Sequence, residues 1–206
     1  PECQLSGVSR QLKPGEYLWY RRTIPLAKPQ QDKRILLHFG AADQTAEVFV
    51  NRISAVRHCG GYLPFSADIT DYLQEGDNEL IVRIQDESNT SWHARGKQSL
   101  KPGGMFYTAQ SGLWQTVWME AVHPEGLQSV QLLTDIDQQQ LVVRPRFYKE
   151  AGGKLQVTLK DNGKVVASRT VSASSLSSVV LPVKKMKTWS PESPFLYDLE
   201  YKVLDK

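Results

Sequence analysis

Short alternating apolar runs, rather than helical periodicity, most constrain what this chain can fold into. Stretches of β-branched and aromatic residues recur along it, separated by Gly, Pro, Asn and Asp. The segment 34–39 is typical, because Ile35, Leu37 and Phe39 fall on one face of an extended chain. Many short strands divided by turns predict an all-β protein built from sandwiches.

A run of turn-forming residues divides this pattern in two. His123-Pro124-Glu125-Gly126 cannot continue a strand, and the alternation starts again after it. We therefore predict two domains, residues 1–123 and 124–206. An immunoglobulin-like sandwich of about 100 residues has seven strands, whereas the second domain offers six, so we expect it to lack its last strand.

The predicted strands follow the alternation within each domain. In the first domain they are 16–24, 34–39, 46–50, 55–57, 79–85 and 115–122, with one helical turn inside 66–73. In the second domain they are 127–134, 140–148, 154–160, 165–171, 177–183 and 197–204. Tight hairpin turns are predicted at Asn51-Arg52 and at Asp161-Asn162-Gly163.

Charge and hydropathy argue against two classes of partner. The net charge is +3 and the basic residues are dispersed, which gives nucleic-acid binding little support. No apolar run approaches the ~20 residues of a membrane helix. The first methionine is Met105, so we expect the chain to have been cut at its start. The compartment therefore stays open: bacterial periplasmic, secreted and cytoplasmic locations are all compatible with the sequence.

Neither a metal nor a cofactor is predicted. The four histidines make no cluster with metal spacing, and the adjacent His58 and Cys59 point to opposite faces of a strand. No Gly-rich phosphate loop follows a strand, and no serine sits in a nucleophile elbow. The two cysteines, Cys3 and Cys59, either form one disulfide or stay free thiols.

The stretch 86–111 is the candidate functional loop, because unstructured loops of this length are uncommon and often functional. Its exposed aromatic residues lie near Arg, Lys and Gln, a mixture that suits the apolar face and hydroxyl rim of a sugar. The alternative is a loop held down by its own aromatics. Asp86, at its mouth, either serves a site or caps a turn. Trp114 and Trp118 are expected to share one strand face in the core.

Motifs spread over almost the whole chain resemble those of one enzyme family. They are Trp19–Ile24, Leu36–Ala41 followed by Ala46–Asn51, His58–Phe65 followed by Asp68–Thr70, Gly96–Gln98, Ser111–Glu120 and Trp189–Leu199. In this order they resemble the family-two glycoside hydrolases, the group of β-galactosidases, β-glucuronidases and β-mannosidases. One departure is Arg52, which stands where the family usually has Gly.

The resemblance implies a jelly-roll domain, loosely called sugar-binding, over 1–123 and an immunoglobulin-like domain over 124–206. A (β/α)₈ barrel carrying both catalytic glutamates follows in that family, so it implies that this chain stops before the barrel and holds no catalytic residue. In some relatives the loop region reaches the barrel and completes the sugar pocket. The resemblance assigns this role to four residues: Trp92, Arg95, Lys97 and Tyr107.

Three functions are therefore carried forward. The first is an accessory, non-catalytic fragment of a retaining β-glycosidase, with carbohydrate and the missing barrel as partners. The second is a free-standing carbohydrate-binding module. The third is a structural or adhesive pair of sandwiches with a protein partner. An incomplete second sandwich could accept a strand from another chain or exchange one with a copy of itself, which would make a homo-oligomer.

Overall fold

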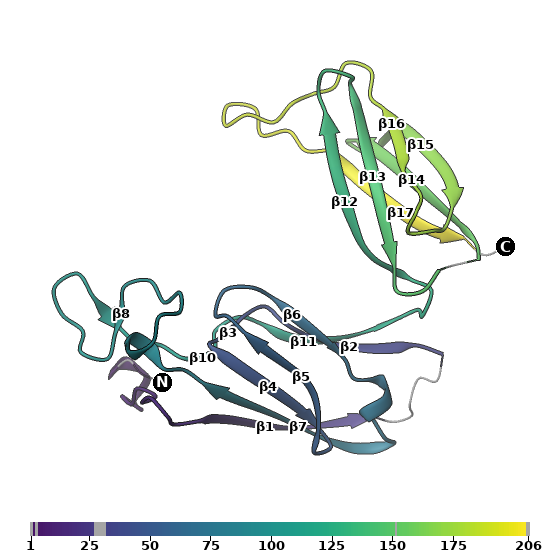
Figure 1. Cartoon of the computed structure of the whole chain (residues 1–206). Coiled ribbons are helices and arrows are strands. Elements are labelled where there is room, and N and C mark those ends of the chain that lie inside the picture. The colour runs from purple at the N-terminus through teal and green to yellow at the C-terminus, as the bar shows by residue number, and fades with distance from the viewer. Residues whose placement is uncertain (1, 3, 27–31, 151, 205–206) are drawn as a thin grey trace. The chain divides into compact units, whose positions relative to one another are not determined.

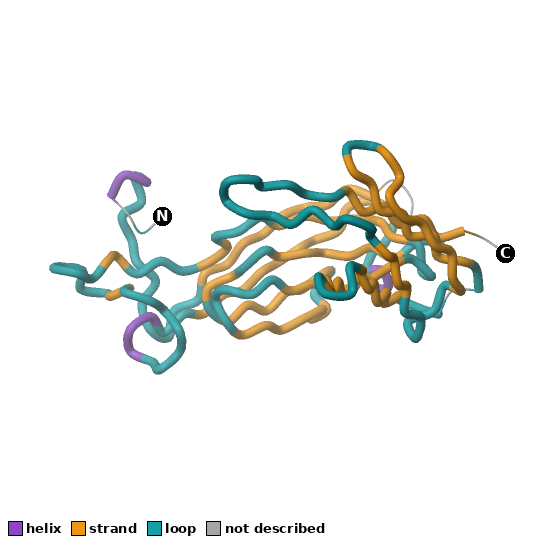
Figure 2. Tube along the Cα trace, turned by 90° about the horizontal axis from the view of Figure 1, so that it is seen from above, coloured by secondary structure: helices purple, strands orange, loops and turns teal. Residues whose placement is uncertain are grey.

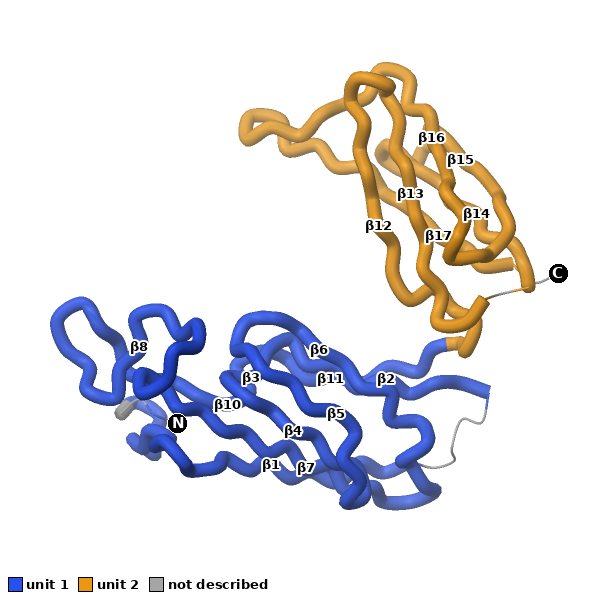
Figure 3. Tube along the Cα trace, viewed as in Figure 1, with its two compact units in different colours: residues 1–122 blue, residues 123–206 orange. Residues whose placement is uncertain are grey.

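The computed structural model describes residues 2, 4–26, 32–150 and 152–204. The chain divides into two compact units, residues 1–122 and 123–206 (Figure 3). The all-β prediction is confirmed: strands make up both units, and helix is confined to short turns (Figure 2). Among the described residues the only helices are three-residue 3₁₀ turns, none of which could span a membrane.

Unit 1 is a sandwich of two antiparallel sheets (Figure 1). One sheet has the order β1 (Leu18–Leu26), β7 (Gly76–Gln85), β4 (Thr45–Val50), β5 (Ile53–Cys59). The other has the order β11 (Val117–Val122), β2 (Arg34–Phe39), β6 (Phe65–Asp68). Neighbours that are distant in sequence, such as β1 and β7, give the crossing connections of a jelly roll.

Alternation fills the core of unit 1 from both sheets. The inward residues of β4 are Ala46, Val48 and Val50, all completely buried, and they face Leu37 and Phe39 of β2 in the same cluster. Small two-stranded pieces close one end of the sandwich. They are β3 (Ala42–Asp43) with β10 (Gly112–Leu113), and β8 (Gln98–Ser99) with β9 (Tyr107–Thr108).

Unit 2 is a second, smaller sandwich with its own core. One sheet has the order β12 (Leu127–Asp135), β13 (Gln140–Phe147), β16 (Val179–Pro182). The other has the order β15 (Lys164–Ser172), β14 (Lys154–Asp161), β17 (Asp198–Leu204). These are the six predicted strands. Within the described residues β17 pairs only with β14, and a seventh strand beyond it stays a prediction.

Both predicted hairpin turns form. Asn51 and Arg52 have φ values of 49° and 71°, and Asn162 and Gly163 have 47° and 80°. Positive φ at both central positions is the geometry of a type I′ turn, which matches the twist of the strands. Arg52 therefore adopts a backbone conformation that glycine would adopt more easily.

Two local predictions were wrong. β1 does not end before Pro25 but continues through it, because β1 is an edge strand and needs no N–H on its outer side. Trp114 and Trp118 do not share a core strand: β11 begins at Val117, and the two side chains are 50 % and 45 % exposed. The choice between a disulfide and free thiols stays open, because Cys59 has no disulfide partner among the described residues and Cys3 lies outside them.

Candidate functional site

Two buried carboxylates meet at one end of unit 1. β4 and β7 run antiparallel with Thr45 opposite Gln85. Asp43 comes just before β4 and Asp86 just after β7, so both lie at the same end of the sheet, which we call the pocket end. Their residues are only 8 % and 3 % exposed. Buried aspartates are rare unless they have hydrogen-bond or ion-pair partners. The partners of Asp86 and Asp43 differ.

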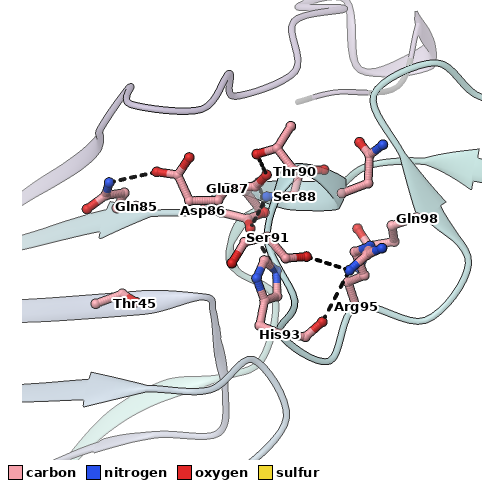
Figure 4. Close-up of polar contacts among 12 residues, drawn as sticks. Thr45, Gln85, Asp86, Glu87, Ser88, Thr90, Ser91, His93, Arg95 and Gln98 are labelled. Carbon is pink, nitrogen blue, oxygen red and sulfur yellow. Dashed lines mark hydrogen bonds and ion pairs between the residues drawn. The ribbon is translucent and has the colours of Figure 1, made fainter.

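Asp86 contacts three residues of the long loop, two of which, Ser88 and His93, are labelled in Figure 4. Its Oδ1 accepts a hydrogen bond from the Ser88 N–H at 2.7 Å, and its Oδ2 accepts one from the Ser111 hydroxyl at 2.6 Å. The His93 Nε2 lies 3.4 Å from the Asp86 Oδ1. Asp86 therefore caps a turn, as one interpretation of the sequence held, and also joins the two ends of the loop 86–111.

Asp43 is less well satisfied. Its Oδ1 is buried and has no hydrogen-bond partner. Burial, together with the charge of Asp86, raises the pKa of Asp43 from 3.8 to about 6, although Gln98 and His93 oppose the rise. Gly61 lies against this carboxyl: a Cβ at that position would be 2.5 Å from the Oδ1, so any larger residue would displace the Asp43 side chain.

Unsatisfied buried polar atoms gather at this end. Within the described residues they are the Asp43 Oδ1, the Ser88 Oγ and both ring nitrogens of His93. The His93 Nε2 is close enough to Asp86 for an ion pair, but it is poorly directed for a hydrogen bond. Buried polar atoms are nearly always paired in native proteins, so a group of exceptions marks a functional site candidate.

A cavity of about 420 Å³ opens beside these carboxylates. Its aromatic wall is the Trp114 ring, which is fixed because its Nε1–H donates to the Gly61 carbonyl at 2.7 Å. The Tyr62 ring packs edge-on against Trp114, with the centroids 6.4 Å apart. The residues that line the cavity are Glu2, Tyr20, Asp43, Tyr62, Gln98, Gln110, Ser111, Leu113 and Trp114.

The polar part of the lining is held by backbone hydrogen bonds. The Gln98 Oε1 accepts from the Gln110 N–H at 2.6 Å, and the Glu2 Oε1 accepts from the Ser111 N–H at 3.1 Å. The Tyr20 hydroxyl accepts from the Leu113 N–H at 3.2 Å. A half-exposed indole beside amide, hydroxyl and carboxylate groups suits a ligand with an apolar face and several hydroxyls.

None of the four residues predicted from the resemblance lines this cavity. Trp92 is 97 % exposed on the loop, and Lys97 is exposed as well. The Arg95 guanidinium donates to the Ser91 carbonyl at 2.7 Å and so supports the loop's own backbone (Figure 4). Tyr107, in β9, is 68 % exposed. These four residues belong to one loop but do not line a common pocket. Their contact with sugar stays a prediction.

The cavity residues that the sequence analysis missed come from separate segments. Asp43 lies in β3, Tyr62 follows β5, and Trp114 follows β10. Two signals were available in hindsight: the polar Asp43 interrupts an apolar run, and Gly60-Gly61 precedes an aromatic. Within the described part of the chain no three His, Cys, Asp or Glu side chains gather closely enough to hold a metal ion.

Fold and site define a two-sandwich β protein whose first unit carries an aromatic and polar pocket. Residues 11–122 match the model described as glycosyl hydrolases family 2, sugar binding domain, and residues 127–206 match the model described as glycosyl hydrolases family 2. The chain therefore belongs to family 2 of the glycosyl hydrolases, and it contains the non-catalytic domains that these two models describe.

Relatives of known sequence and structure cover most of this chain. It is 26 % identical over 203 residues to a β-galactosidase from Thermoanaerobacter pseudethanolicus, covering 90 % of this chain and 26 % of that protein. It is 29 % identical over 215 residues to the human β-glucuronidase, covering 89 % and 32 %. A family 2 member from Bacteroides cellulosilyticus has the same fold, with a TM-score of 0.72 at 23 % identity, covering 91 % and 26 %. The chain thus spans about a quarter to a third of these proteins.

Proposed function

We propose that this chain is the accessory part of a retaining β-glycosidase and that its pocket end forms one wall of the sugar site. The observation that carries the proposal is the pocket itself, where a fixed indole, two amides and a buried carboxylate line one cavity. A (β/α)₈ barrel packed against this end would close the cavity and supply the reacting groups.

Chemistry in the intact enzyme would need two further carboxyl groups. In a retaining glycosidase one carboxylate attacks the anomeric carbon while the other protonates the leaving oxygen and later activates water, and the two lie about 5–5.5 Å apart. Asp43 and Asp86 are not offered for these roles. Asp86 is already hydrogen-bonded within its own loop, and the Asp43 Oδ1 is covered by Gly61.

The first prediction is that the 206-residue chain alone does not hydrolyse 4-nitrophenyl β-glycosides. Release of 4-nitrophenol should stay at the level of buffer, for galactoside and glucuronide alike. Turnover that survives repurification and disappears in Asp86→Asn would contradict the accessory role. The reading frame beyond Lys206 is an independent check, because the proposal expects it to encode an Asn-Glu pair at a barrel strand end and a second Glu further on.

A free-standing carbohydrate-binding module is the second candidate function. The observation in its favour is Trp92, which is 97 % exposed, on the same loop as Tyr107 at 68 %. Exposed aromatic rings are the usual platform for the apolar face of a sugar. Amide shift changes confined to 92–107 on titration with oligosaccharides would favour this function, whereas changes around Ser111 and Trp114 would favour the pocket.

A further inference from the structure

The charge of the pocket is one-sided. Two of the residues that line the cavity, Asp43 and Glu2, carry carboxyl groups. Asp86 lies behind Ser111, outside the lining, and its Oδ1 is 3.4 Å from the His93 Nε2. No Lys, Arg or His is among the described residues that line the cavity. Arg95, the nearest cation on the loop in sequence, donates to the backbone carbonyls of Ser91 and His93 instead.

We infer that this pocket accepts an uncharged glycosyl residue and rejects a uronate. The inference rests on the proposed function and names its substrate class. It matters because relatives of this chain include proteins named β-galactosidase and proteins named β-glucuronidase, so membership of the family does not decide between the two.

Two physical effects support this choice. Like charges in a partly desolvated cavity repel, because the low local dielectric constant strengthens the Coulomb interaction between them. Ionised carboxylates also only accept hydrogen bonds. Sugar hydroxyls can donate to them, whereas a sugar carboxylate has no proton to give. An anionic ligand would need a cationic partner, and the lining provides none.

The remaining polar groups fit a neutral ligand. The Gln110 amide can donate and accept, and so can the Tyr20 hydroxyl. The Gln98 side chain lines the cavity too, but it already accepts from the Gln110 N–H and is hydrogen-bonded to Asp43. Trp114 is 50 % exposed and lines the cavity, and its Nε1–H is already engaged with Gly61, so its aromatic ring is left to contact the C–H groups of a sugar. Aromatic wall and neutral donors together match a hexopyranoside without an acid group.

A matched pair of ligands tests the inference on the 206-residue chain. Methyl β-D-glucopyranoside and methyl β-D-glucuronide differ only in the carboxylate, and the corresponding galacto pair repeats the test with the other configuration. In a ¹H–¹⁵N titration at low salt, the neutral glycosides should shift the Ser111 and Leu113 amides and the Trp114 indole saturably. The uronides should bind on the order of tenfold more weakly than the neutral glycosides. Added salt should reduce this difference in affinity, because it screens the repulsion.

Two variants test whether the carboxylates of the lining cause the weaker binding of uronides. Asp43→Asn and Glu2→Gln each remove one carboxylate without changing its size, and each should bring uronide affinity closer to that of the neutral sugar. Glu2→Gln keeps an oxygen that can accept from the Ser111 N–H, so it remains informative if Asp43→Asn misfolds. Asp137→Asn, in unit 2, is the matched control and should leave the ratio unchanged.

Several outcomes would overturn the inference. They are uronide binding as tight as neutral binding, a ratio unaffected by both variants, or no shift with any ligand up to its solubility limit. The last result would show that the pocket does not select sugars by itself. None of these outcomes touches the accessory role, which fails separately through hydrolysis by the isolated chain or through a downstream frame without a barrel.

Discussion

β4 and β7 have buried polar side chains at both of their ends. At one end these side chains are fully hydrogen-bonded, and at the other end several of their atoms have no partner among the described residues. At the end away from the pocket, which we call the far end, Val50 lies opposite Leu80. Asn51 follows β4 there and Asn78 lies near the start of β7. Asn78 is completely buried. Each hydrogen-bonding atom of its amide has a partner, in contrast to Asp43 at the pocket end.

The far-end network is closed. The Asn78 Oδ1 accepts from the Asn51 Nδ2 at 2.7 Å and from the Gln74 N–H at 2.8 Å. Its Nδ2 donates to the Gln74 carbonyl at 2.9 Å and to the Gly76 carbonyl at 3.1 Å. Asn51 in turn donates to the Tyr72 carbonyl and accepts from the Glu79 N–H. This network ties two turns and the 3₁₀ segment Thr70–Tyr72 together.

The contrast separates structure from function within one sheet. A satisfied buried network adds stability and fixes a single conformation, whereas an unsatisfied one costs stability. All the unpaired buried side-chain atoms found in the described residues lie at the pocket end. The far end therefore has the character of scaffold, and the unpaired groups at the pocket end support the proposal that a ligand or partner domain binds there.

The largest expected effect is at the far end. Asn78→Ala removes an amide that hydrogen-bonds five groups, so we expect the free energy of unfolding of unit 1 to fall by about 4 kcal/mol. Urea unfolding followed by tryptophan fluorescence reports mainly on this unit, because four of the five tryptophans lie in it. Asn89→Ala is the control: Asn89 is exposed and accepts only the Leu100 N–H. A loss below about 1 kcal/mol for Asn78→Ala would contradict a structural role for the network.

The pocket end should respond in the opposite direction. The pKa of Asp43 is raised from 3.8 to about 6 in the folded chain, so the folded state binds this proton more tightly than the unfolded state. Stability is therefore lost as the pH rises from about 4 to about 6, and the whole cost is present above that window. Asp43→Asn should stabilise unit 1 at pH 7.5 by up to about 3 kcal/mol.

Asp43→Asn should no longer be more stable than the parent chain at acidic pH. Near pH 4 Asp43 is protonated in the folded state, so variant and parent should unfold at nearly the same urea concentration. Asp71→Asn, which changes an exposed carboxylate in the same unit, should leave the unfolding curve in place at both pH values. If Asp43→Asn were destabilising at pH 7.5, the burial cost assigned to this carboxylate would be wrong.

The architecture was predictable because it rests on local signals. Period-two alternation in segments such as 34–39, and turn residues such as Asn162-Gly163, act within a few residues of each other. The alternation predicted all six strands of unit 2. Errors arose where tertiary position decides: Pro25 stays in β1 because that strand is at an edge.

The candidate site was harder to predict because it is made by long-range contacts. Asp43, Gly61 and Trp114 meet only after the chain has crossed between sheets, and no spacing in sequence marks them as neighbours. The Trp114 indole N–H donates to the Gly61 carbonyl, and the ring, which was expected in the core, lines a cavity instead. Exposed aromatics on the loop were easier to notice, and none of them lines the cavity.

The smallest expected effect concerns Asp68, a carboxylate at the far end whose pKa moves the other way from that of Asp43. Partial burial alone would raise the pKa of Asp68, but hydrogen bonds from Thr70 and Arg34 outweigh it and lower the pKa. Its Oδ1 accepts from the Thr70 N–H at 3.1 Å and its Oδ2 from the Arg34 Nε at 2.7 Å. The stability that ionised Asp68 adds to the folded state is fully present above the ordinary carboxyl pKa. It is lost as the pH falls through the lowered pKa of Asp68 in the folded state.

Asp68→Asn should therefore cost about 1 kcal/mol at pH 7, since the ion pair with Arg34 is partly exposed to solvent, and the cost should shrink as the pH is lowered toward 3. Urea unfolding of parent and variant at pH 7, 5 and 3.5 measures both parts. Arg34→Gln should show the same loss with the same pH dependence, because it removes the other half of the pair. If the cost of Asp68→Asn grew in acid, Asp68 would behave like Asp43, and the division of unit 1 into a satisfied far end and an unsatisfied pocket end would fail.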